Sequence, residues 1–229
     1  MSSLPSIPKT HDLLRLSCLE LEQADAVKPE WLDAVLKACP WVVVRRAVSH
    51  GKQVPVGVRG KERAQRWAAF VNPEQIAQIV SPNQLRESLV ESSRRSLPAF
   101  HSLRFLGMKA ALKGLEWGPG GSAGFELASG RPTVTQASDL DIVIRALEPF
   151  DRAFANSICV QLESVSTRVD VLIETPYCGF SLDEYAHSQL DKVLVRTDTG
   201  RFLAADPWDV SSGRRLEGRS RYLLFPTLS

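Results

Sequence analysis

Residues 118–145 read GPGGSAGFELASGRPTVTQASDLDIVIR, and they contain the two most informative patterns in the chain. The second pattern, Asp139-Leu140-Asp141, opens a β-branched run that is typical of a strand. Because side chains alternate along a strand, Asp139 and Asp141 share one face, and the intervening apolar residues share the other. Two ionised carboxylates this close repel each other. A divalent cation that prefers oxygen ligands, typically Mg²⁺, relieves that repulsion.

A third acid stands in a similar run, RVDVLIE at residues 168–174. Asp170 is flanked there by apolar residues that favour a strand, so a neighbouring strand would bring it to the same place as Asp139 and Asp141. Each pattern also has a commoner explanation. An Asp-x-Asp motif is more often part of a solvated surface, and a glycine-rich turn more often only connects two elements. The first pattern in residues 118–145 is the glycine-rich turn Gly118–Gly124, which contains Gly121-Ser122 and lacks the Gly-Lys-Ser/Thr ending of a P-loop. The three features together, in this order, favour a metal site.

The composition is that of an ordinary globular protein. Of the 229 residues, 44% are hydrophobic and 24% are charged, enough for one large domain or two small ones with real cores. The net charge of +2 does not favour nonspecific nucleic-acid binding. Four scattered cysteines without a Cys-x-x-Cys pair favour reduced thiols over zinc. Since no signal-peptide core and no membrane-spanning run is found, we expect a cytoplasmic protein without membrane contact.

We expect an α+β fold in which residues 1–80 form a small N-terminal α/β module with a hairpin. In chain order the predicted elements are a strand at His11–Leu16, a helix from Pro29 to Pro40, a hairpin of Trp41–Arg46 with Val54–Val58, and an amphipathic helix around Arg63–Phe70. Capping motifs at Asn72–Gln75 and Ser81–Gln84 predict two further helix starts.

This first module is more basic than the chain as a whole. Between residues 45 and 66, seven Lys or Arg side chains stand against one acid, Glu62. Such a surface attracts polyanions or acidic proteins, although a solvated surface explains most of these residues singly. Arg59 is the strongest candidate for a functional contact, because the glycines at 57 and 60 permit close backbone approach.

Residues 81–229 are predicted to form a second domain with a mixed sheet and flanking helices. In chain order we expect a helix within Ala99–Leu115, a hairpin of Gly124–Leu127 with Pro132–Thr135, a short helix at Asp151–Asn156, paired strands at Ile158–Leu162 and Val169–Ile173, a helix from Ser181 to Ser188, and a late hairpin around Asp198–Gly200. The basic stretch Arg214–Arg221 ends the chain as a solvated surface or as a cover over the anion site.

The Gly-Ser turn, the Asp-x-Asp and the later strand Asp resemble the nucleotidyltransferase (polymerase-beta-like) superfamily. The whole chain resembles the malonate decarboxylase holo-acyl carrier protein synthase family, whose members are phosphoribosyl-dephospho-coenzyme A transferases. The discriminating segments are N-terminal, because the core motif is shared by many nucleotidyltransferases. The segments that carry the resemblance are His11–Leu14, Val42–Arg46, Val56–Gly60 with Arg63 and Gln65-Arg66, Trp117–Ser122, Gly124–Leu127 and Ser138–Asp141.

This resemblance implies a specific reaction. The donor would be 2'-(5''-triphosphoribosyl)-3'-dephospho-coenzyme A, and the acceptor a serine hydroxyl on the acyl carrier protein of malonate decarboxylase. The products would be a phosphodiester-linked prosthetic group and pyrophosphate. Such a transfer depends mainly on positioning and charge neutralisation, which two Mg²⁺ ions supply in related chemistry.

The residues fit that reaction in the following roles. Asp139 and Asp141 would bridge both ions. Asp170 would complete the site for the ion nearest the nucleophile, and it is a candidate to accept the serine proton. Gly121 and Ser122 would hold the terminal phosphates, because oriented backbone N–H groups form an anion nest. Arg59 would bind the remaining donor phosphate or the carrier protein.

Two other functions stay open. The first is a different nucleotidyltransferase, acting on a small-molecule hydroxyl or on RNA, with the basic module selecting the substrate. The second is a binding module that keeps the fold without the chemistry. The presence of all three acids argues against the second, and the use of ordinary nucleotides as donors would favour the first.

Overall fold

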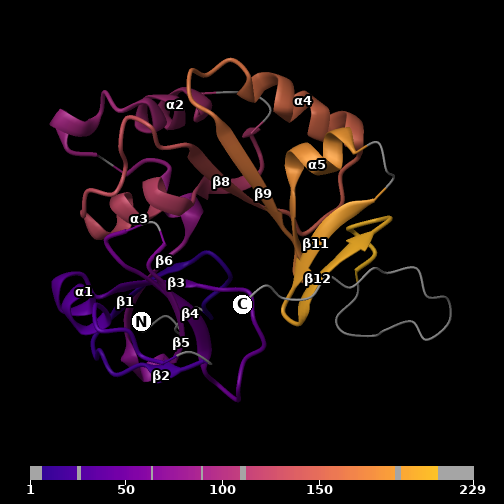
Figure 1. Cartoon of the computed structure of the whole chain (residues 1–229). Coiled ribbons are helices and arrows are strands. Elements are labelled where there is room, and N and C mark those ends of the chain that lie inside the picture. Colours follow the sequence, from indigo (N-terminus) through magenta and orange to yellow (C-terminus); the bar gives the residue numbers. More distant parts are fainter. Residues whose placement is uncertain are drawn as a thin grey trace, which may run out of the picture.

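A computed structural model of the chain describes residues 7–24, 27–62, 64–88, 90–108, 112–188 and 192–210. Two six-stranded sheets and five α-helices make up this part of the chain, so the predicted α+β class is confirmed. The N-terminal sheet uses strands from residues 13–80 and the C-terminal sheet uses strands from residues 116–204. Figure 1 shows the two sheets one above the other, with most helices on the outside of the upper one.

The N-terminal sheet is antiparallel throughout its described pairs, and helix α1 is inserted between its strands β2 and β3 in chain order. Its strand order is β2-β5-β4-β3-β1-β6. The predicted first strand, first helix and hairpin are confirmed. The elements are β1 (Leu13–Leu16), β2 (Glu22–Gln23), α1 (Leu32–Ala38), β3 (Trp41–Val44), β4 (Val54–Arg59), β5 (Arg66–Val71) and β6 (Ile76–Val80).

The amphipathic helix expected around 63–70 is wrong, because residues 66–71 form β5. Trp67, Ala69 and Val71 recur every second residue and join one core of the N-terminal sheet, and Phe70 between them is also buried. Arg63 lies outside the described residues. Both capping motifs are formed, but they cap only the 3₁₀ turns η1 (Pro73–Gln75) and η2 (Pro82–Leu85).

The C-terminal sheet has the order β12-β11-β10-β9-β8-β7. Among the described strand pairs of this sheet, only β8 and β9 run parallel, and they are joined by the crossover helix α4. The late hairpin and the helix after Ser181 are confirmed. The elements are the 3₁₀ turn η3 (Ser92–Arg94), α2 (Pro98–Leu106), β7 (Glu116–Pro119), α3 (Gly121–Ser129), β8 (Leu140–Arg145), α4 (Arg152–Leu162), β9 (Val169–Glu174), β10 (Gly179–Ser181), α5 (Leu182–His187), β11 (Val193–Thr197) and β12 (Gly200–Ala204).

Two predictions between residues 121 and 162 are wrong. The hairpin expected over 124–135 is instead helix α3, which ends at Gly130 in the left-handed conformation. The strand expected at 158–162 is the second half of α4, which begins at its cap Asp151. In α4 the buried residues Ala155 and Ile158 are three apart, which is a helical spacing.

The two faces of the C-terminal sheet have different neighbours. Leu140, Ile142 and Ile144 are at most 1% exposed and pack in the main core with residues of α2, α4 and α5. The opposite face carries Asp141 and Arg145 on β8, because side chains alternate. Helix α3 lies between the two sheets (Figure 1), where Phe125 packs against Leu13 and Trp41 of the N-terminal sheet.

No helix within the described residues is long and apolar enough to cross a membrane. The domain division near residue 80 stays a prediction. The basic stretch at 214–221 lies outside the described residues.

Candidate active site

The turn from β7 into α3 presses directly on Asp141. The Gly120 N–H donates to the backbone carbonyl of Asp141 at 2.8 Å. Gly121 has φ +51°, and a Cβ at this position would lie 1.7 Å from Asp141 Oδ2. Both the left-handed backbone and the lack of room exclude any side chain at residue 121. The glycine-rich segment therefore brings backbone, rather than side chains, against the carboxylate.

The parallel strands place two of the predicted acids side by side. Asp141 on β8 is the register partner of Asp170 on β9, so both side chains project from the same face. Asp141 is half-buried, whereas Asp139, directly before β8, is exposed. The ligand oxygens of the three acids do not all come within 4.8 Å of one another; among the described residues only Cys159, Asp183 and His187 do so.

Asp170 has a basic neighbour on its own strand. Arg168 Nε donates to Asp170 Oδ1 at 3.0 Å, and the two side chains are 73% and 47% exposed. An ion pair this exposed contributes about 0.5 kcal/mol or less to stability. Asp170 is therefore held only loosely and is accessible from solvent.

Ser122 occupies the first turn of α3 and is buried. The helical bonds of this turn begin with Gly124 N–H, which donates to Gly120 O at 2.7 Å. The N–H groups of residues 121–123 therefore have no acceptor within the helix. Groups of this kind at a helix N-terminus can bind anions. The Ser122 carbonyl accepts from Thr133 Oγ1 at 2.9 Å, which ties the turn to the segment that leads into Asp139.

A buried ion pair supports this site, and the sequence analysis missed it. Glu126 on α3 pairs with Arg94 and accepts the N–H groups of Thr133 and Val134 at 2.7 and 2.8 Å. Arg94 also donates to the Val134 carbonyl at 2.7 Å. One buried carboxylate thus fixes three segments around the loop before Asp139. The only sequence signal was an acid within the otherwise small and apolar run 121–129.

The pKa values of this pair are shifted in opposite directions. Burial alone would raise the pKa of Glu126, but the hydrogen bonds from Arg94, Val134 and Thr133 outweigh burial and lower it. The hydrogen bond to Glu126 raises the pKa of Arg94 despite its partial burial. Both groups are therefore charged at neutral pH.

The N-terminal sheet is joined to the same two strands that carry the acids, by two buried clusters of ion pairs. In the first cluster, Glu174 at the end of β9 accepts from His11 Nε2 at 2.9 Å and from Arg46 Nη2 at 2.5 Å. In the second, Arg145 at the end of β8 donates to Asp12 Oδ1 at 2.7 Å. The buried side chains are at most 12% exposed, apart from His11 at 27%.

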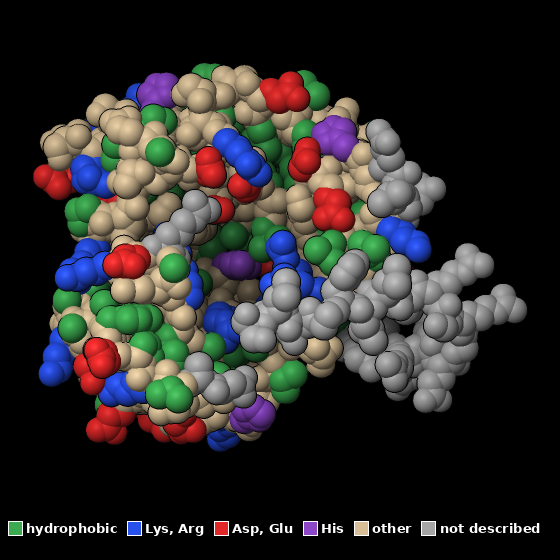
Figure 2. Space-filling model, in the orientation of Figure 1, with side chains coloured by type: hydrophobic (Ala, Val, Ile, Leu, Met, Phe, Trp, Pro, Cys, Tyr) green, Lys and Arg blue, Asp and Glu red, His purple; other side chains and the backbone are tan. Residues whose placement is uncertain are grey.

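These clusters stand about 13 Å from Asp141 and Asp170, since four residues of strand separate the two groups along each strand. Figure 2 shows a hollow at the centre of this face of the molecule, with a histidine and Lys or Arg side chains in it and acidic side chains above it. The N-terminal sheet therefore bounds the surface on which the acids lie.

Arg59 lies at the end of β4, where it is the register partner of Arg66. It belongs to the N-terminal sheet, whereas the acids belong to the C-terminal one. Its role stays a prediction.

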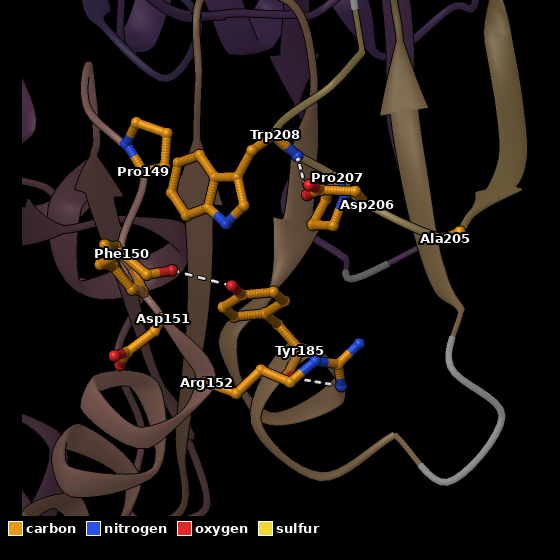
Figure 3. A pocket seen from close by; sticks show the side chains of 9 residues that line it. All are labelled: Pro149, Phe150, Asp151, Arg152, Tyr185, Ala205, Asp206, Pro207 and Trp208. Carbon is orange, nitrogen blue, oxygen red and sulfur yellow. Dashed lines mark hydrogen bonds between the residues drawn. The ribbon is translucent and has the colours of Figure 1, made fainter.

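Two cavities of about 480 and 490 Å³ lie away from the acids. Figure 3 shows the first, where Phe150, Tyr185 and Trp208 lie close together beside the start of α4. The Tyr185 hydroxyl donates to the Phe150 carbonyl at 2.8 Å, so this lining is internally bonded. The second lies between the N-terminal sheet and the end of α3, and is lined by Arg15 and Arg131 among others. Neither lining includes Asp139, Asp141 or Asp170.

Comparisons with known proteins match almost the whole chain. The family described as "Phosphoribosyl-dephospho-CoA transferase MdcG N-terminal domain" matches residues 9–82, and the corresponding C-terminal domain matches residues 84–207. A phosphoribosyl-dephospho-CoA transferase of Pseudomonas fluorescens (strain Pf0-1) is 40% identical over 88% of this chain and 95% of its own length.

Two further relatives with the same description agree. The protein of Pseudomonas aeruginosa is 38% identical over 89% of this chain and 95% of its own length. That of Klebsiella pneumoniae (strain 342) is 35% identical over 90% and 98%. No solved structure matches. This chain therefore belongs to the MdcG family of enzymes, the phosphoribosyl-dephospho-CoA transferases.

Proposed function

We propose that this enzyme transfers 2'-(5''-triphosphoribosyl)-3'-dephospho-CoA to a serine hydroxyl of the malonate decarboxylase acyl carrier protein and releases pyrophosphate. Family membership supports the donor. The observation that supports the chemistry is the register pairing of Asp141 with Asp170, with the Gly121 turn pressed against Asp141. We further propose a polymerase-beta-like nucleotidyltransferase fold for the C-terminal domain, residues 81–229. Residues 1–80 would form the second domain, and Arg59 within it would contact the donor or the carrier protein.

The acids suit Mg²⁺, which binds carboxylate and phosphate oxygens in many phosphate-transfer sites, because all three offer oxygen ligands. Asp141 and Asp170 share a face, and Asp139 stands two residues before Asp141 at the solvent edge. We assign these three residues as ligands of two ions. When bound, such ions would lower the pKa of the serine hydroxyl and neutralise charge on the leaving pyrophosphate.

The protein's own groups would position the reactants. The amides of Gly121 and Ser122 would donate to the terminal phosphates, since the first N–H groups of α3 have no acceptor within the helix. Asp170 is exposed and projects from the same face as Asp141, so it is a candidate to accept the serine proton. Glu126 and Arg94 hold the loop before Asp139 and would keep its carboxylate in place.

Mass spectrometry of the apo carrier protein tests this function. The carrier is incubated with the enzyme, Mg²⁺ and the triphosphoribosyl donor. We expect a mass gain equal to the donor minus pyrophosphate, on one serine. Modification from ATP or CTP instead would identify a different nucleotidyltransferase. No modification from any donor by a folded enzyme would contradict the proposal.

A further inference from the structure

A second cluster of potential ligands lies on the outer surface, where α4 and α5 run beside each other (Figure 1). Cys159 comes from α4, and Asp183 and His187 stand four residues apart on α5. The sulfur, a carboxylate oxygen and a ring nitrogen all lie within 4.8 Å of one another. Sequence spacing predicted no zinc site, because these ligands come from helices that only the fold brings together.

The geometry is close to that of a metal site. His187 Nδ1 is 3.0 Å from Asp183 Oδ1. Two ligands of a tetrahedral ion with bonds of 2.0–2.1 Å stand about 3.3 Å apart, so little movement is needed to admit one. The other ring nitrogen, Nε2, is 2.8 Å from Asn156 Oδ1. An outer acceptor of this kind orients a metal-bound histidine and fixes its tautomer.

The chemistry of the cluster selects the kind of ion. Sulfur and imidazole ligands suit a borderline-soft transition metal such as Zn²⁺ and do not suit Mg²⁺. Thiol catalysis is a poor alternative, because burial, and secondarily the Asp183 charge, raises the pKa of Cys159 to about 11. The neighbouring carboxylate repels a thiolate, whereas a divalent cation would attract both groups.

We infer that Cys159, Asp183 and His187 bind one Zn²⁺ ion, with Asn156 orienting the histidine. The three ligands leave the fourth position to water. The ion would bind the folded protein in preference to the unfolded one and would fasten α5 to α4, so it would stabilise the C-terminal sheet by mass action. This site is separate from Asp141 and Asp170, because α4 and α5 pack on the opposite face of the C-terminal sheet.

The test is a Co²⁺ titration of the reduced full-length enzyme, followed by absorption spectroscopy. We expect one Co²⁺ per chain with a thiolate-to-cobalt charge-transfer band, displaced by equimolar Zn²⁺. Cys159→Ala and His187→Ala should lose the band, and Asn156→Ala should weaken binding about tenfold. The matched control is Cys18→Ser, which removes an exposed cysteine elsewhere and should keep the band.

Asp141→Asn separates this site from the proposed Mg²⁺ site and should also keep the band. Circular dichroism and transferase activity check that Cys159→Ala is folded. A wild-type protein without the band, or a band that survives in Cys159→Ala or disappears in Cys18→Ser, would overturn the inference.

Discussion

The contact between Gly121 and Asp141 is the tightest constraint in the candidate site. The backbone at residue 121 is left-handed, and the Asp141 carboxylate occupies the space of the missing Cβ. Gly130 at the other end of α3 is also left-handed, with φ +70°, but a Cβ there would meet nothing within 4 Å. Substitutions at Gly121 and Gly130 therefore distinguish two effects. Both would strain the backbone, but only a side chain at residue 121 would collide with Asp141.

We predict that Gly121→Ala lowers kcat about 100-fold, because displacing a reacting group by about 1 Å has effects of this size. Gly130→Ala should cost about 1 kcal/mol of stability through its left-handed backbone and leave kcat unchanged. Urea unfolding and steady-state transfer assays measure the two effects. Equal losses of activity in both variants would show that the contact with Asp141 has no special role.

Removing a carboxylate tests the proposed ligands. Asp139→Asn and Asp141→Asn should each lose about 4 kcal/mol of transition-state stabilisation, or about 10³-fold in rate, because each removes a metal ligand. Asp33→Asn is the control, since that exposed acid pairs with Lys28 in the N-terminal module. Single-turnover transfer at saturating Mg²⁺ measures the rates, and near-wild-type transfer by either variant would refute its assignment.

At the scale of the elements, the sequence was most informative where a strand is rich in valine or isoleucine or where a helix has a clear cap. Strands β3, β4 and β8 and the capped helix α5 were all predictable on these grounds. Helix α3 was not, because its residues from Ser122 to Glu126 are all buried and leave no amphipathic stripe to recognise. The role of the buried Glu126 in this helix depends on its partners Arg94, Thr133 and Val134, which lie in other segments of the chain.

The lowered pKa of Glu126 predicts a pH dependence of stability. Because the unfolded state takes up the proton more readily, the ion pair stabilises the fold above the ordinary pKa of glutamate, about 4.3. That stability is lost as pH falls through the lower pKa of the folded state. Glu126→Gln should therefore cost about 2 kcal/mol at pH 7 and less below pH 4.

Urea unfolding at pH 7 and at pH 3.5 measures this difference. The control is Glu116→Gln, whose exposed carboxylate lies 3.5 Å from Arg145 Nη1 and should change stability by about 0.5 kcal/mol or less. A cost for Glu126→Gln that does not shrink in acid would show that shape, rather than charge, stabilises this region.

At the scale of the whole molecule, the two sheets are held together by charges that are far apart in sequence. Arg46 and Glu174 are separated by 128 positions, and Asp12 and Arg145 by 133. Hydrophobic periodicity carries no information about such pairs, so the sequence predicted the acids of each strand but not the junction between the sheets. The sequence predicted that Asp141 and Asp170 lie near each other, but not that they are register partners. The register depends on the length and packing of the crossover between β8 and β9, which includes helix α4.

Arg46 offers a matched test of this junction, because it contacts two carboxylates. Glu174 is 7% exposed, whereas Asp198 is 57% exposed and 3.3 Å away. We predict that Glu174→Gln costs about 3 kcal/mol, because it weakens a buried pair. Asp198→Asn should cost about 0.5 kcal/mol or less.

Thermal unfolding measures both costs, and amide hydrogen exchange in β1 shows whether the N-terminal sheet loosens. Faster exchange there in Glu174→Gln alone would support the junction. Equal effects in both variants would mean that the buried carboxylate is no more important than the exposed one.

Strand β9 carries Asp170 and Glu174 on one face, four positions apart, with the register fixed by β8. A single residue inserted or deleted between them would turn one of the two carboxylates toward the core, whichever end kept its pairing. Two constraints therefore oppose insertions and deletions in this strand. Asp170 must stay at the proposed metal site, and Glu174 must stay in contact with Arg46 and His11 of the N-terminal module. Among natural homologues, gaps should accumulate in the 163–168 connection and stop abruptly at Val169.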